Sequence, residues 1–275
     1  MKHIQSIFWS TLIIASFGSL SIINGQDKPQ KEYVYQTFKD TRVINTYSIE
    51  TLQKGVMDIR ITHRFGDFIN QGSFENAWTT FFGFESAADV AFGLEYGITN
   101  NFMVGVHRSK AAGPLKSLIT LLAKYKLLSQ TKDNKMPISM TLAGSTSVST
   151  MWQSSNSQSL ASFTSDKGYS FAYRMIYSLQ MHIGRKFGDI VSMQISPTLV
   201  WRNLVQYNDN NALGSVGICA KFQVTKVLGI ILDANLPFDK LRWTAGSGYY
   251  IPNTTLNWLE GQFRIGFTIY RAFRM

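Results

Sequence analysis

Hydrophobic and polar residues alternate along much of the chain after residue 55. In the first such stretch, Met57, Ile59 and Ile61 alternate with Asp58, Arg60 and Thr62. A period of two places successive side chains on opposite faces of an extended strand. The pattern therefore predicts a β-strand with one apolar and one polar face.

The same alternation recurs along the chain and predicts ten strands in all. We expect them near residues 57–65, 90–96, 102–107, 119–127, 138–143, 171–183, 191–202, 215–222, 228–236 and 262–273. The stretch 117–128 also fits a helix, because its leucines have helical spacing as well. A hairpin missing from the region 237–260 would change this number, so counts of eight or twelve strands stay open.

The connections between the predicted strands are short and long in turn. Four tight turns, at 98–101, 131–136, 188–189 and 225–226, alternate with longer links near 66–87, 110–116, 150–168, 204–211 and 237–260. Short turns at one rim and long loops at the other are typical of a membrane barrel, whereas a soluble sandwich would have a polar outward face. The sequence therefore predicts an all-β fold: an antiparallel up-and-down transmembrane β-barrel.

The N-terminus has the pattern of a secretory signal peptide. Lys2 and His3 precede an apolar stretch, 4–23, that is interrupted by serine and glycine, and polar residues follow Gly25. A single membrane helix would be more uniformly apolar, so a signal peptide over 1–25 is favoured. We then expect a periplasmic N-terminal extension over 26–54, the barrel over 55–275, and a location in the bacterial outer membrane.

Charge and cysteine content narrow the partners. The 275 residues carry a formal net charge of +10, and the only cysteine, Cys219, excludes an intrachain disulfide. A basic balance often indicates nucleic acid. An exported protein is not expected to meet nucleic acid, so the charge is better assigned to the lumen or to lipid headgroups. The expected partners are outer-membrane lipids and, during biogenesis, the barrel-assembly machinery.

The polar face of the predicted strands is rich in cations. Its basic residues are Arg60, Arg64, Lys124, Lys126, Arg174, Arg202, Lys221 and Arg264, against the acidic Asp58, Glu95 and Asp233. Burying these cations in a dry interior would be costly. Two interpretations stay open: a narrow, closed lumen with hydrogen-bonded ion pairs, which is favoured, and a pore that admits water and anions.

Few residues suggest other chemistry. The predicted loop 74–87 is strongly aromatic, and its candidate contacts for an apolar ligand are Trp78, Phe81, Phe82 and Phe84. His63, His107 and His182 do not have metal-ligand spacing, so neither a metal nor another cofactor is expected. No catalytic residue can be nominated, and an enzyme is the less favoured reading.

Several segments resemble a family of outer-membrane β-barrel proteins known only as a domain of unknown function. The matching pieces include FGLEYGITNNFMVGVHRSK at 92–110, RKFGDIVSMQISPTLVWRNLV at 185–205 and FRIGFTIYRAF at 263–273. The resemblance implies a barrel in the outer membrane and no particular activity. The function we expect is a structural or small-solute transport role with a basic lumen. The alternatives are a lipid hydrolase or protease, or a surface-binding barrel acting through its long loops.

Overall fold

The computed structural model describes residues 32–65, 78, 79, 81, 87–110, 117–151, 170–203, 205, 210–225, 228–238 and 262–269. It includes the side chains of all of these except 64–65, 87–89 and 262–269. The predicted signal peptide lies outside the described residues. No helix in the described part of the chain is both long and apolar enough to cross a bilayer.

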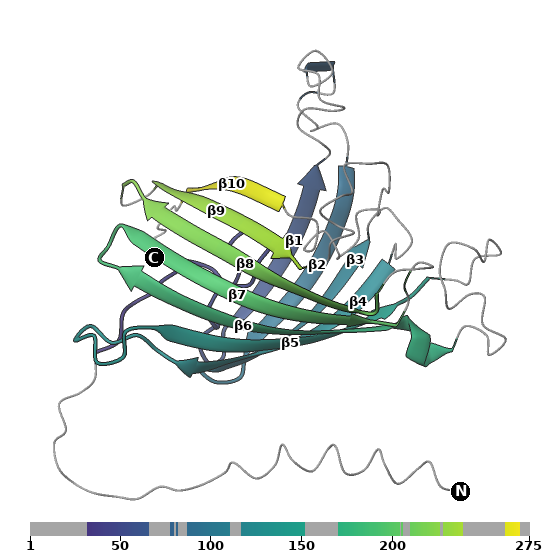
Figure 1. Cartoon of the computed structure of the whole chain (residues 1–275), viewed down its shortest axis with the longest axis horizontal. Helices are drawn as coiled ribbons and strands as arrows, with labels where there is room; N and C mark the ends of the chain where they lie inside the picture. Colours follow the sequence, from purple (N-terminus) through teal and green to yellow (C-terminus); the bar gives the residue numbers. More distant parts are fainter. Residues whose placement is uncertain are drawn as a thin grey trace, which may run out of the picture. The chain divides into compact units, whose positions relative to one another are not determined.

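In the described part of the chain, ten antiparallel strands form one sheet in which each strand pairs with its neighbour in sequence (Figure 1). They are β1 (Met57–Phe65), β2 (Ala87–Gly97), β3 (Phe102–Lys110), β4 (Ser117–Leu128), β5 (Ser139–Ser149), β6 (Met175–Phe187), β7 (Val191–Arg202), β8 (Ala212–Gln223), β9 (Leu228–Pro237) and β10 (Gln262–Ile269). This order confirms the predicted all-β, up-and-down architecture.

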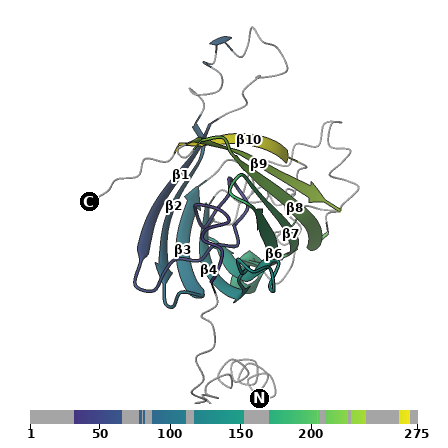
Figure 2. The ribbon, with the colours of Figure 1, turned by 90° about the vertical axis from the view of Figure 1, so that its left-hand side faces the viewer.

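The sheet curls, so that its strands surround a concave face (Figure 2). Within the described strands, pairing runs from β1 to β10 without a hydrogen-bonded pair between these two ends. The stretch 117–128 is strand β4 and not a helix. Its backbone pairs with β3 on one side and β5 on the other, and this long-range pairing outweighs the helical spacing of its leucines.

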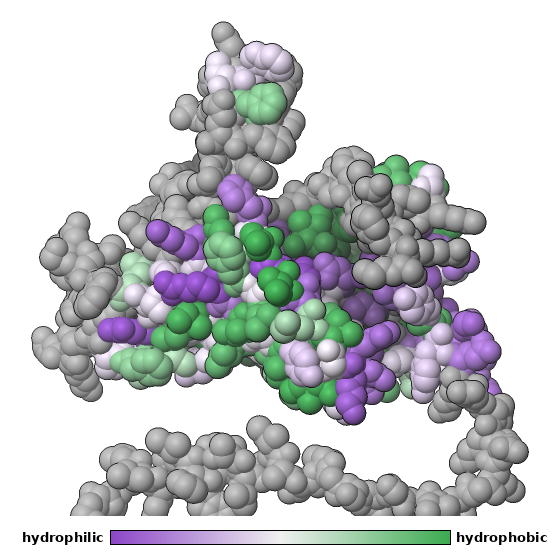
Figure 3. All heavy atoms as spheres, turned by 180° about the vertical axis from the view of Figure 1, so that it is seen from behind, coloured by the Kyte–Doolittle hydropathy of each residue, from purple (hydrophilic) through white to green (hydrophobic). Residues whose placement is uncertain are grey.

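The alternation in sequence sets the two faces of the sheet. Ile59 and Leu199 on the outer face are 71% and 57% exposed, whereas Glu95 and Lys124 on the concave face are fully buried. Figure 3 shows apolar side chains lying next to one another on part of the outer surface, among hydrophilic ones. A face of this kind is suited to lipid, because isolated soluble proteins rarely expose so many large apolar groups together.

The start of β6 differs from the prediction. Phe171–Arg174 forms a 3-10 turn, η4, and the strand begins only at Met175. The turn closes with a hydrogen bond from the Tyr173 amide to the Ser170 carbonyl. The Asn203 side chain donates to the Ala172 carbonyl and ties the turn to the end of β7. Arg174, predicted on the polar face of a strand, therefore lies in this turn.

The largest difference concerns residues 32–54, here called the inner segment, which the sequence analysis treats as an extension separate from the barrel. Figure 2 shows this part of the chain within the curve of the sheet. Its Phe38 and Ile49 are buried and pack with Cys219 of β8. The predicted boundary at residue 55 therefore does not separate the segment from the sheet. Residues 32–34 pair with the backbone of residues 130–132. Further along, strand side chains rather than a neighbouring strand bind the backbone of the segment, which therefore has no regular period.

Candidate functional site

The inner segment forms a small hairpin at its centre. Arg42 and Tyr47 make an isolated antiparallel bridge, and the Val43 amide donates to the Thr46 carbonyl at 2.8 Å. Outside that bridge, the Ser48 amide donates to the Thr41 carbonyl at 2.9 Å. Residues 43–46 are therefore a tight tip, and the side chains of the sheet bind it from several strands.

Asp233 of β9 holds this tip. One carboxylate oxygen accepts the backbone N–H groups of Asn45 and Thr46 at 2.8 and 2.9 Å. The other accepts the Thr46 hydroxyl at 2.8 Å. Asp233 is only 3% exposed, and a buried carboxylate is stable when several donors satisfy it. The tip thus satisfies a charge that the sheet alone would leave buried.

The second half of the segment is bound by amide and hydroxyl groups. The Gln194 side chain of β7 accepts from the Ile49 amide at 2.9 Å and donates to the Tyr47 carbonyl at 2.8 Å. Thr141 of β5 donates to the Ile49 carbonyl at 2.6 Å. These three bonds replace the partners that a neighbouring strand would offer, and buried backbone groups need such partners.

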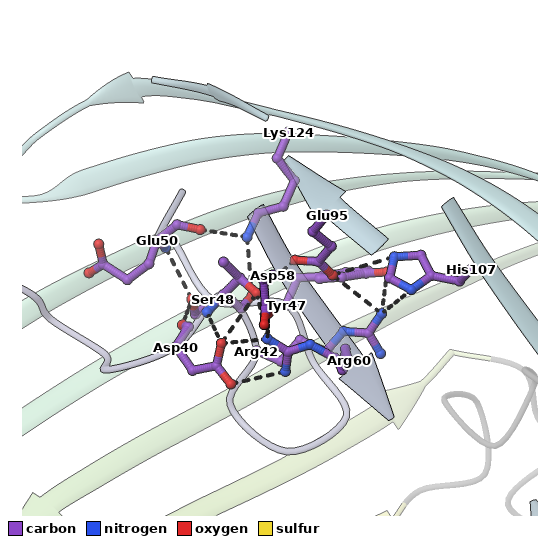
Figure 4. Close-up of polar contacts among 11 residues, drawn as sticks. Asp40, Arg42, Tyr47, Ser48, Glu50, Asp58, Arg60, Glu95, His107 and Lys124 are labelled. Carbon is purple, nitrogen blue, oxygen red and sulfur yellow. Dashed lines mark hydrogen bonds and ion pairs between the residues drawn. The ribbon is translucent and has the colours of Figure 1, made fainter. Parts of the chain in front are cut away.

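A charged cluster joins the first half of the segment to β1, β2 and β3 (Figure 4). Arg60 forms ion pairs with Asp40 at 2.6 Å and with Asp58 at 2.8 Å. The buried Glu95 accepts the Thr41 hydroxyl at 2.9 Å.

Two further groups surround Glu95. The Arg42 guanidinium lies 3.8 Å from it, and Nε2 of His107 lies 3.4 Å from it. Arg42 also donates to the Tyr47 hydroxyl at 3.0 Å. The cluster therefore combines acidic and basic side chains of the inner segment with acidic and basic side chains of the strands.

Lysines of β4, the strand next to β3, bind the same segment. Lys124 donates to the backbone carbonyls of Thr41 and Glu50 at 3.1 and 2.7 Å. Lys126 pairs with the Glu50 carboxylate at 3.1 Å. The other oxygen of Glu50 accepts the Thr37 amide at 2.8 Å. The segment therefore supplies acceptors for cations that the sequence analysis places in the lumen.

Two groups of the segment have shifted pKa values. Burial acts to raise the pKa of Asp40, but its hydrogen bond and ion pair with Arg60 together lower that pKa below the ordinary 3.8. Burial raises the pKa of Tyr47 above the ordinary 10.0. At neutral pH, Asp40 is therefore charged and can form its ion pair with Arg60. Tyr47 is neutral, and its hydroxyl accepts the hydrogen bond from Arg42.

The structure separates the predicted basic residues into two sets. Arg60, Lys124 and Lys126 meet around the inner segment, as described above. Arg202 and Lys221 are buried on the concave face at 2% and 3% exposure. Arg202 donates to the Asn210 carbonyl at 2.7 Å.

The structure places only some of the remaining candidates. Arg174 lies in η4, and the side chains of Arg64 and Arg264 lie outside the description. The predicted loop contacts Trp78 and Phe81 are exposed at 66% and 58%. Phe82 and Phe84 are outside the described residues.

The sequence analysis missed the inner segment as part of the site. Its acids Asp40 and Glu50, its cation Arg42 and its polar tip at Thr46 are all bound by the sheet. The excess of cations over acids on the predicted polar face was the available signal. The acids that pair with two of those cations lie in the inner segment, which precedes the strands in the sequence.

No group of three or more His, Cys, Asp and Glu side chains in the described part of the chain is placed to hold a metal ion. His182 is fully buried, and its Nδ1 lies 2.9 Å from the Ser196 hydroxyl. These two groups and Gln194 lie beneath the inner segment. The site is therefore an interface between the segment and the sheet, made of hydrogen bonds and ion pairs.

A curled antiparallel sheet with an apolar outer face and a polar, occupied concave face defines a membrane β-barrel. Residues 38–247 match the family described as "Membrane bound beta barrel domain (DUF5777)", and the chain belongs to this family. The match begins within the inner segment, so residues 38–54 are part of the family's domain. No curated protein matches the chain.

Proposed function

We propose that the protein is a bacterial outer-membrane barrel, exported by the signal peptide at 1–25, whose inner segment closes its lumen. Displacing that segment opens a narrow path for small anions. The observation that carries the proposal is the binding of the hairpin tip by Asp233. Gln194 and Lys124 add hydrogen bonds to the backbone on either side of that tip. The partners on the outer face are outer-membrane lipids, and the barrel-assembly machinery inserts the strands.

The way the segment is held supports reversible displacement. Among the described buried residues, the apolar cluster that joins it to the sheet consists of Phe38, Ile49 and Cys219, with Val43 packed against it. The other contacts described above are polar. Water can replace a protein hydrogen bond at a modest net cost of about 0.5–1.5 kcal/mol, whereas exposing a large apolar core costs more. A segment held in this way can leave a lumen that fills with water.

The charges of the wall support a preference for anions. With the segment displaced, Lys126 loses the Glu50 carboxylate and Lys124 loses two backbone carbonyls, whereas Arg60 keeps Asp58. Arg202 and Lys221 are also buried on the concave face, so the cations of the described strands there outnumber the acids Asp58, Glu95 and Asp233. Rings of basic side chains favour anions in pores.

The test is conductance in planar lipid bilayers with Asp233→Ala and, as a matched control, Asp189→Ala. The first change removes the two oxygens that accept three hydrogen bonds from the tip, and the second removes a carboxylate that is fully exposed. Asp233→Ala should open more often than the wild type and the control. The reversal potential in a salt gradient should show anion preference. Silent channels in all three proteins would leave a purely structural barrel and contradict the transport role.

A cross-link can fix the segment in place. The Thr46 side chain contacts Cys219, the only cysteine of the chain, so Thr46→Cys places a second thiol beside it. Oxidation should join the two, and a reductant should release them. In the Asp233→Ala background, oxidised Thr46→Cys should stop the openings, and reduction should restore them. The control with Cys219→Ala added should respond to neither treatment.

A further inference from the structure

We propose a second site on the concave face, for a small inorganic oxyanion such as phosphate, at Lys186, Ser192 and Lys221. These residues form a row across three adjacent strands. Lys186 of β6 is in register with Ser192 of β7, and Ser192 is in register with Lys221 of β8. Neighbouring strands lie about 4.8 Å apart, so the three side chains stand side by side on one face.

Two members of this row are buried without an acceptor. Ser192 is 1% exposed, and its hydroxyl makes no hydrogen bond with any described residue. Lys221 is 3% exposed, and no described residue accepts a hydrogen bond from its ammonium group. Buried donors are nearly always satisfied, and an unpaired buried charge is especially costly. A bound acceptor that reaches both groups would remove this cost.

The third member adds a donor and more positive charge. Lys186 donates to the Tyr35 carbonyl at 3.2 Å and lies 3.7 Å from Asp189, whose carboxylate is fully exposed. The charged groups that act on Lys221 are Lys186, Lys39 and the single acid Glu50. Glu50 is already bound to Lys126 and to the Thr37 amide. Positive charge therefore exceeds negative charge around the row.

The donors define the chemistry of the ligand. Two lysines and one serine are register neighbours on three adjacent strands, and an oxyanion offers several acceptors to such a set of donors. The row lies on the concave face, where Tyr35 and Lys39 of the inner segment approach it. This position faces away from lipid, which favours a free anion over a lipid headgroup. The site does not depend on the lumen conducting.

The test is binding of inorganic phosphate to the purified full chain in non-ionic detergent, by calorimetry at constant ionic strength. The wild type should bind saturably. Lys221→Met, which keeps the length of the side chain, should weaken binding about tenfold, as expected for loss of a charge-assisted hydrogen bond. Ser192→Ala should weaken it less. The matched control is Lys132→Met, because Lys132 is an exposed lysine in the turn between β4 and β5, where it pairs with Glu32 of the inner segment.

Thermal unfolding separates binding from a structural role. Phosphate should raise the Tm of the wild type and of Lys132→Met, because a ligand that binds the native state stabilises it. It should raise the Tm of Lys221→Met far less. Without phosphate, Lys221→Met should be at least as stable as the wild type, since it removes an unpaired buried charge. The proposal fails if the wild type shows no saturable binding, or if Lys221→Met and Ser192→Ala bind as tightly as the wild type.

Discussion

The outer and concave faces of the same strands differ in what they require of their neighbours. On β7, Ile195 is 54% exposed on the outer face, whereas the adjacent Gln194 is 1% exposed on the concave face. The outer side chain needs only an apolar surrounding, which lipid supplies without specific contacts. The concave side chain needs particular donors and acceptors, and the inner segment supplies them. The outer face therefore only has to be apolar, whereas the concave face requires particular side chains at particular positions.

The sharpest test of the outer face is Ile195→Arg. A charged side chain against lipid near the middle of a strand costs roughly 2–4 kcal/mol, while the same change near the interface costs roughly 0–1 kcal/mol. Ile195→Arg should therefore lower the free energy of unfolding in lipid vesicles by the larger amount. The matched control is Ile190→Arg, in the turn that precedes β7, where the isoleucine is 64% exposed. Equal losses in both variants would argue against a lipid-facing outer surface.

The concave face revises a simple expectation about the neighbouring position. In a water-filled lumen, an arginine at position 194 would be tolerated. Here the Gln194 side chain bonds to the Tyr47 carbonyl, the Ile49 amide and the Ser196 hydroxyl. An arginine cannot accept a hydrogen bond, so it would leave the Ile49 amide without its partner. The period of two predicts which way residue 194 points, but it does not predict what the side chain meets there.

Gly97 tests how closely the inner segment approaches the sheet. A Cβ added there would lie 2.1 Å from the Gln53 carbonyl oxygen, so the backbone of the segment or of β2 would have to move. Overpacking of this kind typically costs about 1–3 kcal/mol. Gly97→Ala should lower the Tm in detergent and weaken the docking of residues 52–53. Gly144→Ala is the matched control, because its nearest neighbour, the Ser178 carbonyl, would be 4.0 Å away. If both variants kept the wild-type Tm, the close approach would be refuted.

The strands could be predicted from the sequence because their signal is local. The alternation of Met57, Ile59 and Ile61 with polar residues identifies β1 without reference to any other part of the chain. The inner segment has no such signal, because its partners Asp233 and Gln194 are far away in sequence and bind mainly its backbone. A backbone N–H or carbonyl is the same at every non-proline residue, so no side-chain pattern marks the ones that dock. The row of Lys186, Ser192 and Lys221 likewise becomes visible only once the strand register is known.

The smallest predicted effect concerns the ion pair between Asp40 of the inner segment and Arg60 of β1. The pKa of Asp40 in the folded protein is lowered by Arg60, despite the opposing effect of burial. A lowered folded pKa means that the pair stabilises the fold above the unfolded value of about 3.9, and that this contribution is lost as the pH falls through the folded pKa. Because the Asp40 side chain is 52% exposed, solvent screening limits the contribution to below about 1 kcal/mol.

The measurement is the free energy of unfolding of Asp40→Asn and the wild type between neutral pH and about pH 3, on either side of the unfolded value. The difference between them should be largest at neutral pH and should shrink on acidification, because the wild type loses the same charge that the variant lacks. Asp189→Asn, which alters a fully exposed carboxylate on a tight turn, is the control and should follow the wild type. A difference that stays constant with pH would mean that Asp40 holds the segment through its hydrogen bonds alone. A difference that grows on acidification would contradict the ion pair, because protonation of Asp40 can only weaken its attraction to Arg60.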